Sequence, residues 1–65
     1  MVVKLKGVAP QIGERAFVAE TAAVIGDVKI GDDSSVWYSA VIRGDAGHID
    51  IGSRVSIQDG TVIHC

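Results

Sequence analysis

The sequence is poor in the features that would tie a small chain together covalently or direct it to a membrane. It has one cysteine, Cys65, and one proline, Pro10, among 65 residues. A lone cysteine excludes an intrachain disulfide framework and is typical of reducing compartments, so we predict a cytoplasmic protein. No apolar run reaches the roughly 18 residues of a membrane span, and the start Met1-Val2-Val3-Lys4 lacks the pattern of a secretory signal. We therefore predict no membrane partner.

Positive charge is also scarce. Six Lys and Arg residues against eight Asp and Glu residues give a formal net charge of −2, and the basic residues are scattered. Nucleic-acid surfaces are clustered basic patches, so the sequence predicts no nucleic-acid partner. The length predicts one small domain, residues 1–65. Domains of this size bury only roughly 60% of their unfolded surface, so we expect a metal or a partner chain to add stability.

Helical periodicity is absent, and large aliphatic residues recur instead at intervals of six. The series is interrupted once, by an interval of nine between Ile42 and Ile51. A fixed period of this kind is typical of repeat architectures. The nine aliphatic anchors are Ile12, Val18, Val24, Ile30, Val36, Ile42, Ile51, Ile57 and Ile63. Small or β-branched residues follow the first eight anchors at the fourth position: Ala16, Ala22, Val28, Ser34, Ala40, Ala46, Val55 and Thr61.

Every third hexad begins with Ile-Gly, so three hexads form a unit of eighteen residues, lengthened by three where the series jumps nine. The pattern predicts an all-β fold, a triangular parallel β-solenoid of about three coils. The aliphatic anchors are expected to stack inward, and the small residues at the fourth positions are expected to fill the tight space inside each corner. Residues 1–6 alternate apolar and charged and are predicted to form a strand over the first coil, with a turn at residues 7–10. A small antiparallel β domain is the alternative, but hairpins predict varied rather than fixed turn spacing.

Two polar residues are predicted to meet on the outside of this solenoid. Neighbouring side chains of a strand point to opposite faces, so a residue beside an inward anchor points outward. Arg43 follows the anchor Ile42, and His64 follows Ile63, which is the equivalent anchor one coil later. We therefore predict that Arg43 and His64 stack on the outer surface.

Three further polar residues belong to the same stretch. Asp45 is expected at the corner after Arg43, where the three extra residues bulge out. Gln58 is expected to point outward from a neighbouring face, with Asp59 at its corner, although an Asp-Gly pair is also common in ordinary turns. The pattern predicts that four of these residues gather along one outer edge: Arg43, Asp45, Asp59 and His64.

Plain structural interpretations exist for several of these residues. Arg43 and Asp45 are compatible with a surface ion pair of little energetic value. His48 lies in the loop of extra residues and is predicted to be a surface residue rather than a ligand. Cys65 is predicted to point away from the side of His64 and to be a small, inward or buried residue.

Four segments carry a more specific signal than the hexad pattern: Trp37-Tyr38, Ile42-Arg43-Gly44-Asp45, Ile57-Gln58-Asp59-Gly60 and Val62-Ile63-His64. In this order and spacing they resemble the γ-class carbonic anhydrase family, over about residues 7–65. The resemblance implies a left-handed parallel β-helix of the hexapeptide-repeat type that assembles as a homotrimer.

The resemblance also implies an active site. It implies a divalent metal, zinc or alternatively iron or cobalt, held between two subunits by three histidines, of which His64 corresponds to the first. Arg43 and Asp45 correspond to a pair that meets across subunits near the metal, and Gln58 and Asp59 to a pair that orients metal-bound water. The implied reaction is the reversible hydration of carbon dioxide to bicarbonate by a metal-bound hydroxide.

Part of the implied site is absent from these 65 residues. The other two histidines of the family lie further along, on later coils, so the chain is expected to be a truncated, N-terminal portion of the family-type domain. Carbonic anhydrase activity is therefore expected to require the missing coils. Two other functions remain open, namely a hexapeptide-repeat acyl-CoA transferase or thioesterase-related protein and a non-catalytic trimeric scaffold subunit.

Overall fold

The computed structural model describes all residues, 1–65, and consists of short strands joined by turns. The eight strands are β1 (Val2–Val3), β2 (Gln11–Ile12), β3 (Phe17–Val18), β4 (Ala23–Ile30), β5 (Ser35–Val36), β6 (Val41–Ile51), β7 (Ser56–Ile57) and β8 (Val62–His64). No helix has the length and apolar composition needed to cross a membrane.

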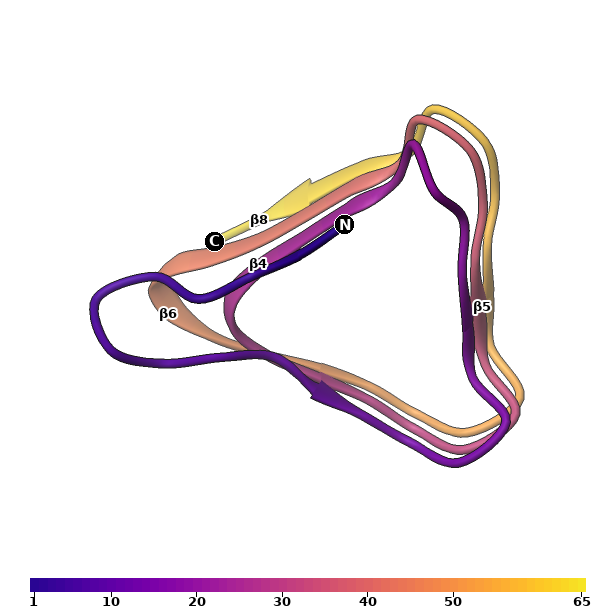
Figure 1. Ribbon diagram of the computed structural model, residues 1–65, viewed down its shortest axis with the longest axis horizontal. Helices are drawn as coiled ribbons and strands as arrows, with labels where there is room; N and C mark the ends of the chain where they lie inside the picture. Colours follow the sequence, from indigo (N-terminus) through magenta and orange to yellow (C-terminus); the bar gives the residue numbers. More distant parts are fainter.

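The chain winds around a triangular prism with three faces (Figure 1). Face 1 contains residues 23–26, residues 41–44 and β8. Face 2 contains β2, residues 28–30 and residues 49–51, and face 3 contains β3, β5 and β7. All strand pairs between coils are parallel, so the predicted solenoid is confirmed.

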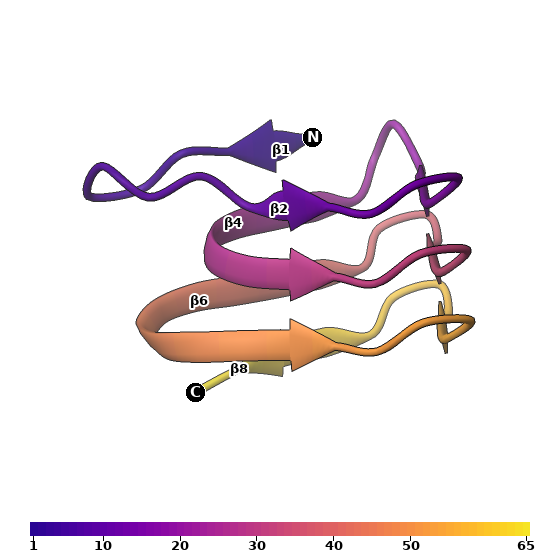
Figure 2. The same cartoon turned by 90° about the horizontal axis from the view of Figure 1, so that it is seen from below.

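Three coils are stacked along the axis, and we number them as coil 1 (residues 12–29), coil 2 (residues 30–50) and coil 3 (residues 51–65). Figure 2 shows the N-terminus at the top of this stack and the C-terminus at the bottom. In Figure 1 the chain runs anticlockwise as it recedes from the viewer. This winding is left-handed, as the resemblance implied.

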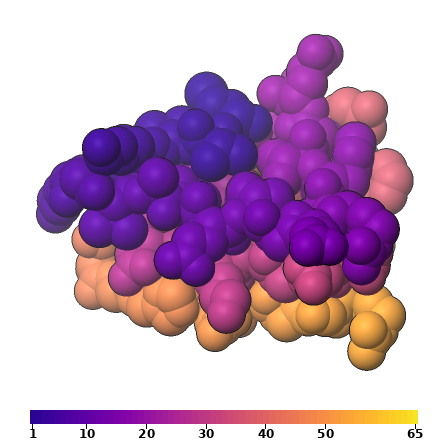
Figure 3. All heavy atoms as spheres, turned by 60° about the horizontal axis from the view of Figure 1, so that its bottom comes forward, coloured from indigo at the N-terminus to yellow at the C-terminus, as the bar shows by residue number.

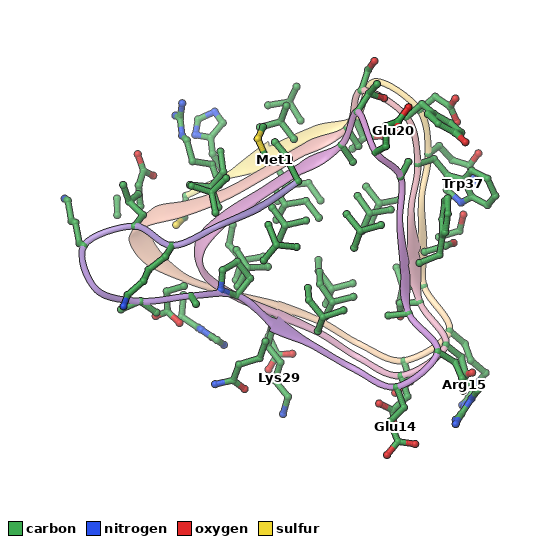
Figure 4. All side chains as sticks on the ribbon, viewed as in Figure 1. Met1, Glu14, Arg15, Glu20, Lys29 and Trp37 are labelled. Atoms are coloured by element: carbon green, nitrogen blue, oxygen red, sulfur yellow. The ribbon has the colours of Figure 1, made fainter.

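The inward anchors form continuous columns. Ile12 is aligned with Ile30 and then Ile51 on face 2, and the anchors of faces 1 and 3 are aligned in the same way. The anchors of the middle of the stack are fully buried, with Ile30 at 1% and Ile42 at 0% exposure. Figure 4 shows the interior of the triangle filled by these side chains, while charged side chains such as Lys29 project outward. The hydrophobic core therefore follows the hexad pattern.

Two predicted inward positions are wrong. Ala46 is exposed, because the extra residues of coil 2 form a loop outside the prism and Ile49 takes the inward position opposite Val28. Cys65 is also exposed. It follows the last ladder pair of face 1 at a corner of coil 3, where no further strand of this chain covers it, and its sulfur lies beside Gly47 of the extra loop.

The N-terminal segment covers part of the top of the stack. β1 pairs in parallel with β4 over two residues, and the Met1 ammonium group donates a hydrogen bond to the carbonyl of Ala22. A bridge between Leu5 and Val8 then reverses the chain toward β2. Figure 3 shows this segment lying across one side of coil 1. The predicted strand over the first coil is confirmed, although it is only two residues long.

A column of alternating charge lies at the corner between faces 2 and 3. Arg15, Asp33 and Arg54 occupy equivalent places in the three coils, all with positive φ, at 59°, 60° and 56°. The Arg15 guanidinium donates to both carboxylate oxygens of Asp33, at 2.7 and 3.1 Å. This hydrogen bonding, with the positive charges of Arg15 and Arg54, holds the pKa of Asp33 below its ordinary value. Hydrogen bonding to Asp33 likewise raises the pKa of Arg15.

The lowered pKa of Asp33 predicts a small dependence of stability on pH. A depressed carboxyl pKa contributes stability above the unfolded value of about 3.9, and this contribution disappears as the pH falls through the folded value. We expect D33N to be less stable than the wild type at neutral pH and equally stable in acid. Urea unfolding over a pH series measures the difference. E20Q, at an exposed corner residue without an ion pair, is the control and should differ little from the wild type at any pH (Figure 4).

Candidate functional site

Face 1 brings three of the predicted site residues together. Arg43 and His64 are register partners on neighbouring strands, so they stack as predicted. Arg43 Nε lies 3.4 Å from Asp45 Oδ2, and the side chains of both residues are partly exposed, at 48% and 36%. An ion pair this open contributes little stability by itself. Its chemical effect is to hold a carboxylate and a guanidinium beside the outward imidazole of His64.

The extra residues of coil 2 determine where Asp45 lies. Between the aligned pairs Gly26–Gly44 and Val28–Ile49 the single residue Asp27 of coil 1 faces four residues of coil 2, 45–48. These four residues belong to β6 and form a bulged loop within it, at the corner between faces 1 and 2. Asp45 thus comes directly after the strand segment that carries Arg43, at the predicted bulged corner.

The same loop contains a contact that the sequence did not predict. His48 Nδ1 lies 2.9 Å from Asp27 Oδ1, and His48 Nε2 lies 3.9 Å from Asp50 Oδ2. Half of the His48 side chain is exposed, which agrees with its prediction as a surface residue. The partner Asp27 could not be identified from the sequence, because the hexad pattern gives no register across a bulge.

A small hollow lies next to this loop. It has a volume of about 200 Å³ and lies between the N-terminal segment and the corner of faces 1 and 2. Its lining includes the carboxylate-bearing residues Asp27 and Asp45, together with Leu5, Lys6, Val8, Gly44 and Gly47. The hollow adjoins the Arg43–Asp45 pair but does not contain His64.

Gln58 and Asp59 lie on a different part of the surface. Gln58 follows β7 on face 3 and donates from Nε2 to Ser56 Oγ at 2.6 Å. Asp59 belongs to the turn between β7 and β8, at the corner between faces 3 and 1. Neither residue has a hydrogen bond or ion pair with Arg43, Asp45 or His64.

The prediction that Asp59 shares one edge with the other three residues is therefore wrong within a single chain. Asp59 and Asp45 lie at opposite ends of face 1, because the length of a strand segment separates the two corners. The hexad pattern predicted the correct face for each side chain but not the distance across the face.

The three aromatic residues of the chain lie on face 3 and at the corner where it meets face 1. They are Phe17 in β3, Trp37 directly after β5, and Tyr38 in the turn that follows. The ring centroids of Phe17 and Trp37 are 5.1 Å apart, and those of Trp37 and Tyr38 are 6.5 Å apart. Phe17 and Tyr38 are 42% and 48% exposed. Trp37 Nε1 donates to Ser35 Oγ at 2.9 Å, which fixes the indole on the outer surface. Face 3 therefore combines an open aromatic cluster with the amide of Gln58.

This chain alone does not assemble a metal centre. It contains no group of three or more His, Cys, Asp or Glu side chains placed to hold a metal ion. His64 offers one imidazole on an exposed strand, and His48 is turned toward Asp27 and Asp50 at another corner. Structural and catalytic zinc sites use three or four protein ligands, so the residues present fit one ligand of a shared site and not a complete set.

Comparison with known families agrees with the repeat. The family model of the bacterial transferase hexapeptide (six repeats) matches residues 9–44, more than half of the chain. The chain belongs to this hexapeptide-repeat family. The matched range contains the six anchors that follow one another without interruption, from Ile12 to Ile42.

Several of the individual relatives that the chain matches are named carbonic anhydrase. The chain is 45% identical to a carbonic anhydrase of Geobacillus kaustophilus, over 98% of this chain and 35% of that protein. It is 51% identical to the mitochondrial gamma carbonic anhydrase 2 of Arabidopsis thaliana, over 85% of this chain and 20% of that protein. The resemblance to the γ-class carbonic anhydrases is confirmed by these matches.

A solved structure supports the fold directly. The crystal structure of a hexapeptide transferase family protein from Anaplasma phagocytophilum matches with a TM-score of 0.82 and 32% identity, over 98% of this chain and 50% of that chain. The chain spans about a fifth to a third of the length of the curated relatives it matches.

Proposed function

We propose that this chain is the N-terminal part of a γ-carbonic-anhydrase-like metalloprotein that hydrates carbon dioxide reversibly to bicarbonate. The observation that carries the proposal is the stacking of Arg43 on His64 with Asp45 beside them, on one outer face of a hexapeptide-repeat solenoid. The relatives named carbonic anhydrase support the substrate. The cytoplasmic location remains our prediction.

In this proposal His64 supplies one of three imidazole ligands to a divalent metal, zinc or alternatively iron or cobalt. When bound, the metal would supply Lewis-acid activation of water near neutral pH. Arg43 and Asp45 would place one positive and one negative charge beside the ligand, and they would help to orient the neighbouring subunit. Because these 65 residues supply one ligand and not a complete set, the chain alone is not expected to catalyse the reaction.

The separation of Gln58 from His64 supports an assembly in which the site forms between subunits. Faces 1 and 3 meet at the corner that contains Asp59. If three prisms stand side by side with this corner toward a common axis, face 1 of each chain lies against face 3 of the next. The amide of Gln58 would then lie opposite the imidazole of His64 in another chain. The exposed aromatic cluster of face 3 supports the same homotrimer, because open aromatic surface favours burial against a partner.

The test is metal analysis and carbon dioxide hydration by the natural gene product, with its length established by mass spectrometry. We expect up to one zinc, iron or cobalt ion per chain. Changing a residue that only hydrogen-bonds to a metal ligand typically lowers metal affinity by about 10–100-fold. H64A removes a ligand itself, so its metal affinity should fall by more than this. H48A is the matched control, since His48 is the other histidine and contacts only Asp27 and Asp50; it should bind metal normally.

The 65-residue chain itself is expected to bind no metal stoichiometrically, because it lacks a three-ligand set. Visible absorption of added cobalt measures this without relying on activity. A natural product that binds no metal, with H64A indistinguishable from the wild type, would reject the proposal. Metal-free binding of coenzyme A would favour the acyl-CoA alternative, and a trimer that binds neither would favour the scaffold.

A further inference from the structure

The bulged loop of residues 45–48 has no apolar side chain that ties it to the core. All four of its residues are exposed, and the chain becomes buried again only at Ile49. None of the four has positive φ, so no unusual backbone conformation fixes the path of the loop. Ordering a residue costs roughly 1–2 kcal/mol of backbone entropy, so a loop of this kind depends on contacts with the rest of the fold.

Asp27 of coil 1 supplies contacts at both ends of this loop. At the beginning of the loop its backbone lies against Gly44, since a Cβ atom on Gly44 would be 2.5 Å from the carbonyl oxygen of Asp27. At the end of the loop the Asp27 carboxylate, through Oδ1, lies 2.9 Å from His48 Nδ1. Asp27 is also the single residue of coil 1 that faces the loop in the register of β4 and β6. One residue therefore holds the loop at its two ends.

The contact between His48 and Asp27 has a defined direction. An ionised carboxylate only accepts hydrogen bonds, so His48 Nδ1 is the donor to Asp27. Hydrogen bonds to an ionised group are stronger than those between neutral groups. The other ring nitrogen, Nε2, lies 3.9 Å from Asp50 Oδ2, so the imidazole is placed between two carboxylates. Both neighbours favour the observed orientation of the ring.

Asp45 is the first residue of the loop, so its position depends on how the loop is held. Its carboxylate lies 3.4 Å from Arg43 Nε. Asp27 and Asp45 also line the same small hollow. Two carboxylates around one space repel each other unless each has a partner of its own. His48 is the partner of Asp27, and Arg43 is the partner of Asp45.

We propose that Asp27 and His48 clamp this loop and thereby position Asp45 beside Arg43. Neither residue of the clamp is a metal ligand or touches substrate; both are positioning residues that act through Asp45. This role rests on the proposed function, in which the Arg43–Asp45 pair lies beside the shared site and helps to orient the neighbouring subunit. Without the clamp, the loop would leave the corner and Arg43 would lose its fixed carboxylate partner.

The Arg43 Nε–H group reports directly on this arrangement. In the natural gene product labelled with 15N-arginine, its NMR signal is identified by its loss in R43K. We expect D27A and H48A each to raise the solvent exchange rate of this group by about two- to fivefold, the factor that corresponds to an exposed ion pair. D45N should do the same. In a D45N background D27A should have no further effect, because the two changes act through one contact.

Two variants are controls for this measurement. D27N keeps an oxygen that accepts from His48 Nδ1, so it should remain close to the wild type. D32A also removes an aspartate, but Asp32 lies at the corner between faces 2 and 3, where it accepts from the Glu14 amide. The Arg43 signal should not change in D32A. Circular dichroism verifies that each variant is folded.

Assembly measures the consequence for the subunit interface. In sedimentation of the metal-free natural product, D27A and H48A should raise the concentration at which half of the trimer dissociates by at least about two- to fivefold. D27A combined with D45N should dissociate like D45N alone. At concentrations where the trimer is complete, H48A should still bind its metal, because His48 is not a ligand in this arrangement.

These outcomes decide the role of the clamp. Wild-type exchange of the Arg43 Nε–H group in both D27A and H48A would overturn it. An equal effect of D27A in the wild-type and D45N backgrounds would also overturn it, because Asp27 would then act on the fold as a whole and not through Asp45. A natural product that forms no trimer and binds no metal would reject the proposed function. The exchange of the Arg43 signal would still decide whether Asp27 and His48 position Asp45.

Discussion

Replacing Ile30 by alanine is expected to destabilise the chain by about 2–5 kcal/mol, the range for truncating a fully buried aliphatic side chain. Ile30 is 1% exposed and lies between Ile12 and Ile51 in the anchor column of face 2. Alanine would leave a cavity that the coils above and below cannot fill, since their backbones are fixed by the ladder. A domain of this size has only roughly 3–10 kcal/mol of stability, so the variant should be largely unfolded at moderate urea concentrations.

I12A is the matched control for this prediction. Ile12 has the same residue type and the same place in the hexad, but it is 38% exposed at the top of the stack. Its truncation removes apolar contacts without enclosing a cavity, so we expect a loss of about 1 kcal/mol. Urea unfolding followed by circular dichroism, at low protein concentration, compares the two. Equal losses at both positions would mean that coil 2 is not the core of the stack.

The second large effect is expected at Gly31. A Cβ atom there would lie 2.6–2.7 Å from three backbone atoms of Gly52 and Ser53. Backbone atoms cannot rotate away as side chains do, so G31A forces coils 2 and 3 apart. We expect a loss of about 3 kcal/mol, at the upper end of overpacking effects. Loss of the bonds between the two coils should also expose β7 and β8 to rapid hydrogen exchange.

G52A separates this steric cause from a general preference for glycine. Gly31 and Gly52 both follow an isoleucine anchor, and neither has positive φ. The nearest atom to a Cβ on Gly52 is Val55 Cγ2, at 3.9 Å, which is an ordinary contact. We expect G52A to change the unfolding free energy by no more than about 0.5 kcal/mol. A similar loss in both variants would show that the glycines are needed for their backbone conformation and not for close approach.

Much of the fold follows from the sequence because each coil repeats the same local rule. The interval of six places every anchor inward, and strand alternation then determines which neighbour points outward. For this reason the stacking of Arg43 on His64 could be predicted from the sequence. The insertion of three residues was visible in the sequence as well, and it placed Asp45 at a bulged corner.

The predictions that failed concern positions where the repeat rule does not apply. Ala46 was assigned by counting from an anchor, but the extra residues leave the prism and Ile49 takes the inward place. Cys65 was assigned by alternation, but burial needs a neighbouring coil as well as a direction. The Asp27–His48 contact depends on how the bulge folds back, which no periodicity encodes.

The sequence by itself determined the parallel solenoid, the anchor columns, and the side of the chain on which each polar residue lies, and its resemblance to the γ-class carbonic anhydrases implied the left-handed winding. Only the tertiary structure decided that Asp59 lies at the opposite end of face 1 from Asp45. The physical reason is that side-chain direction is a local property of a strand, whereas distance across a face depends on how the corners close the triangle. That distance keeps Gln58 and Asp59 away from His64 within one chain, and it is the basis for proposing that the site forms between subunits.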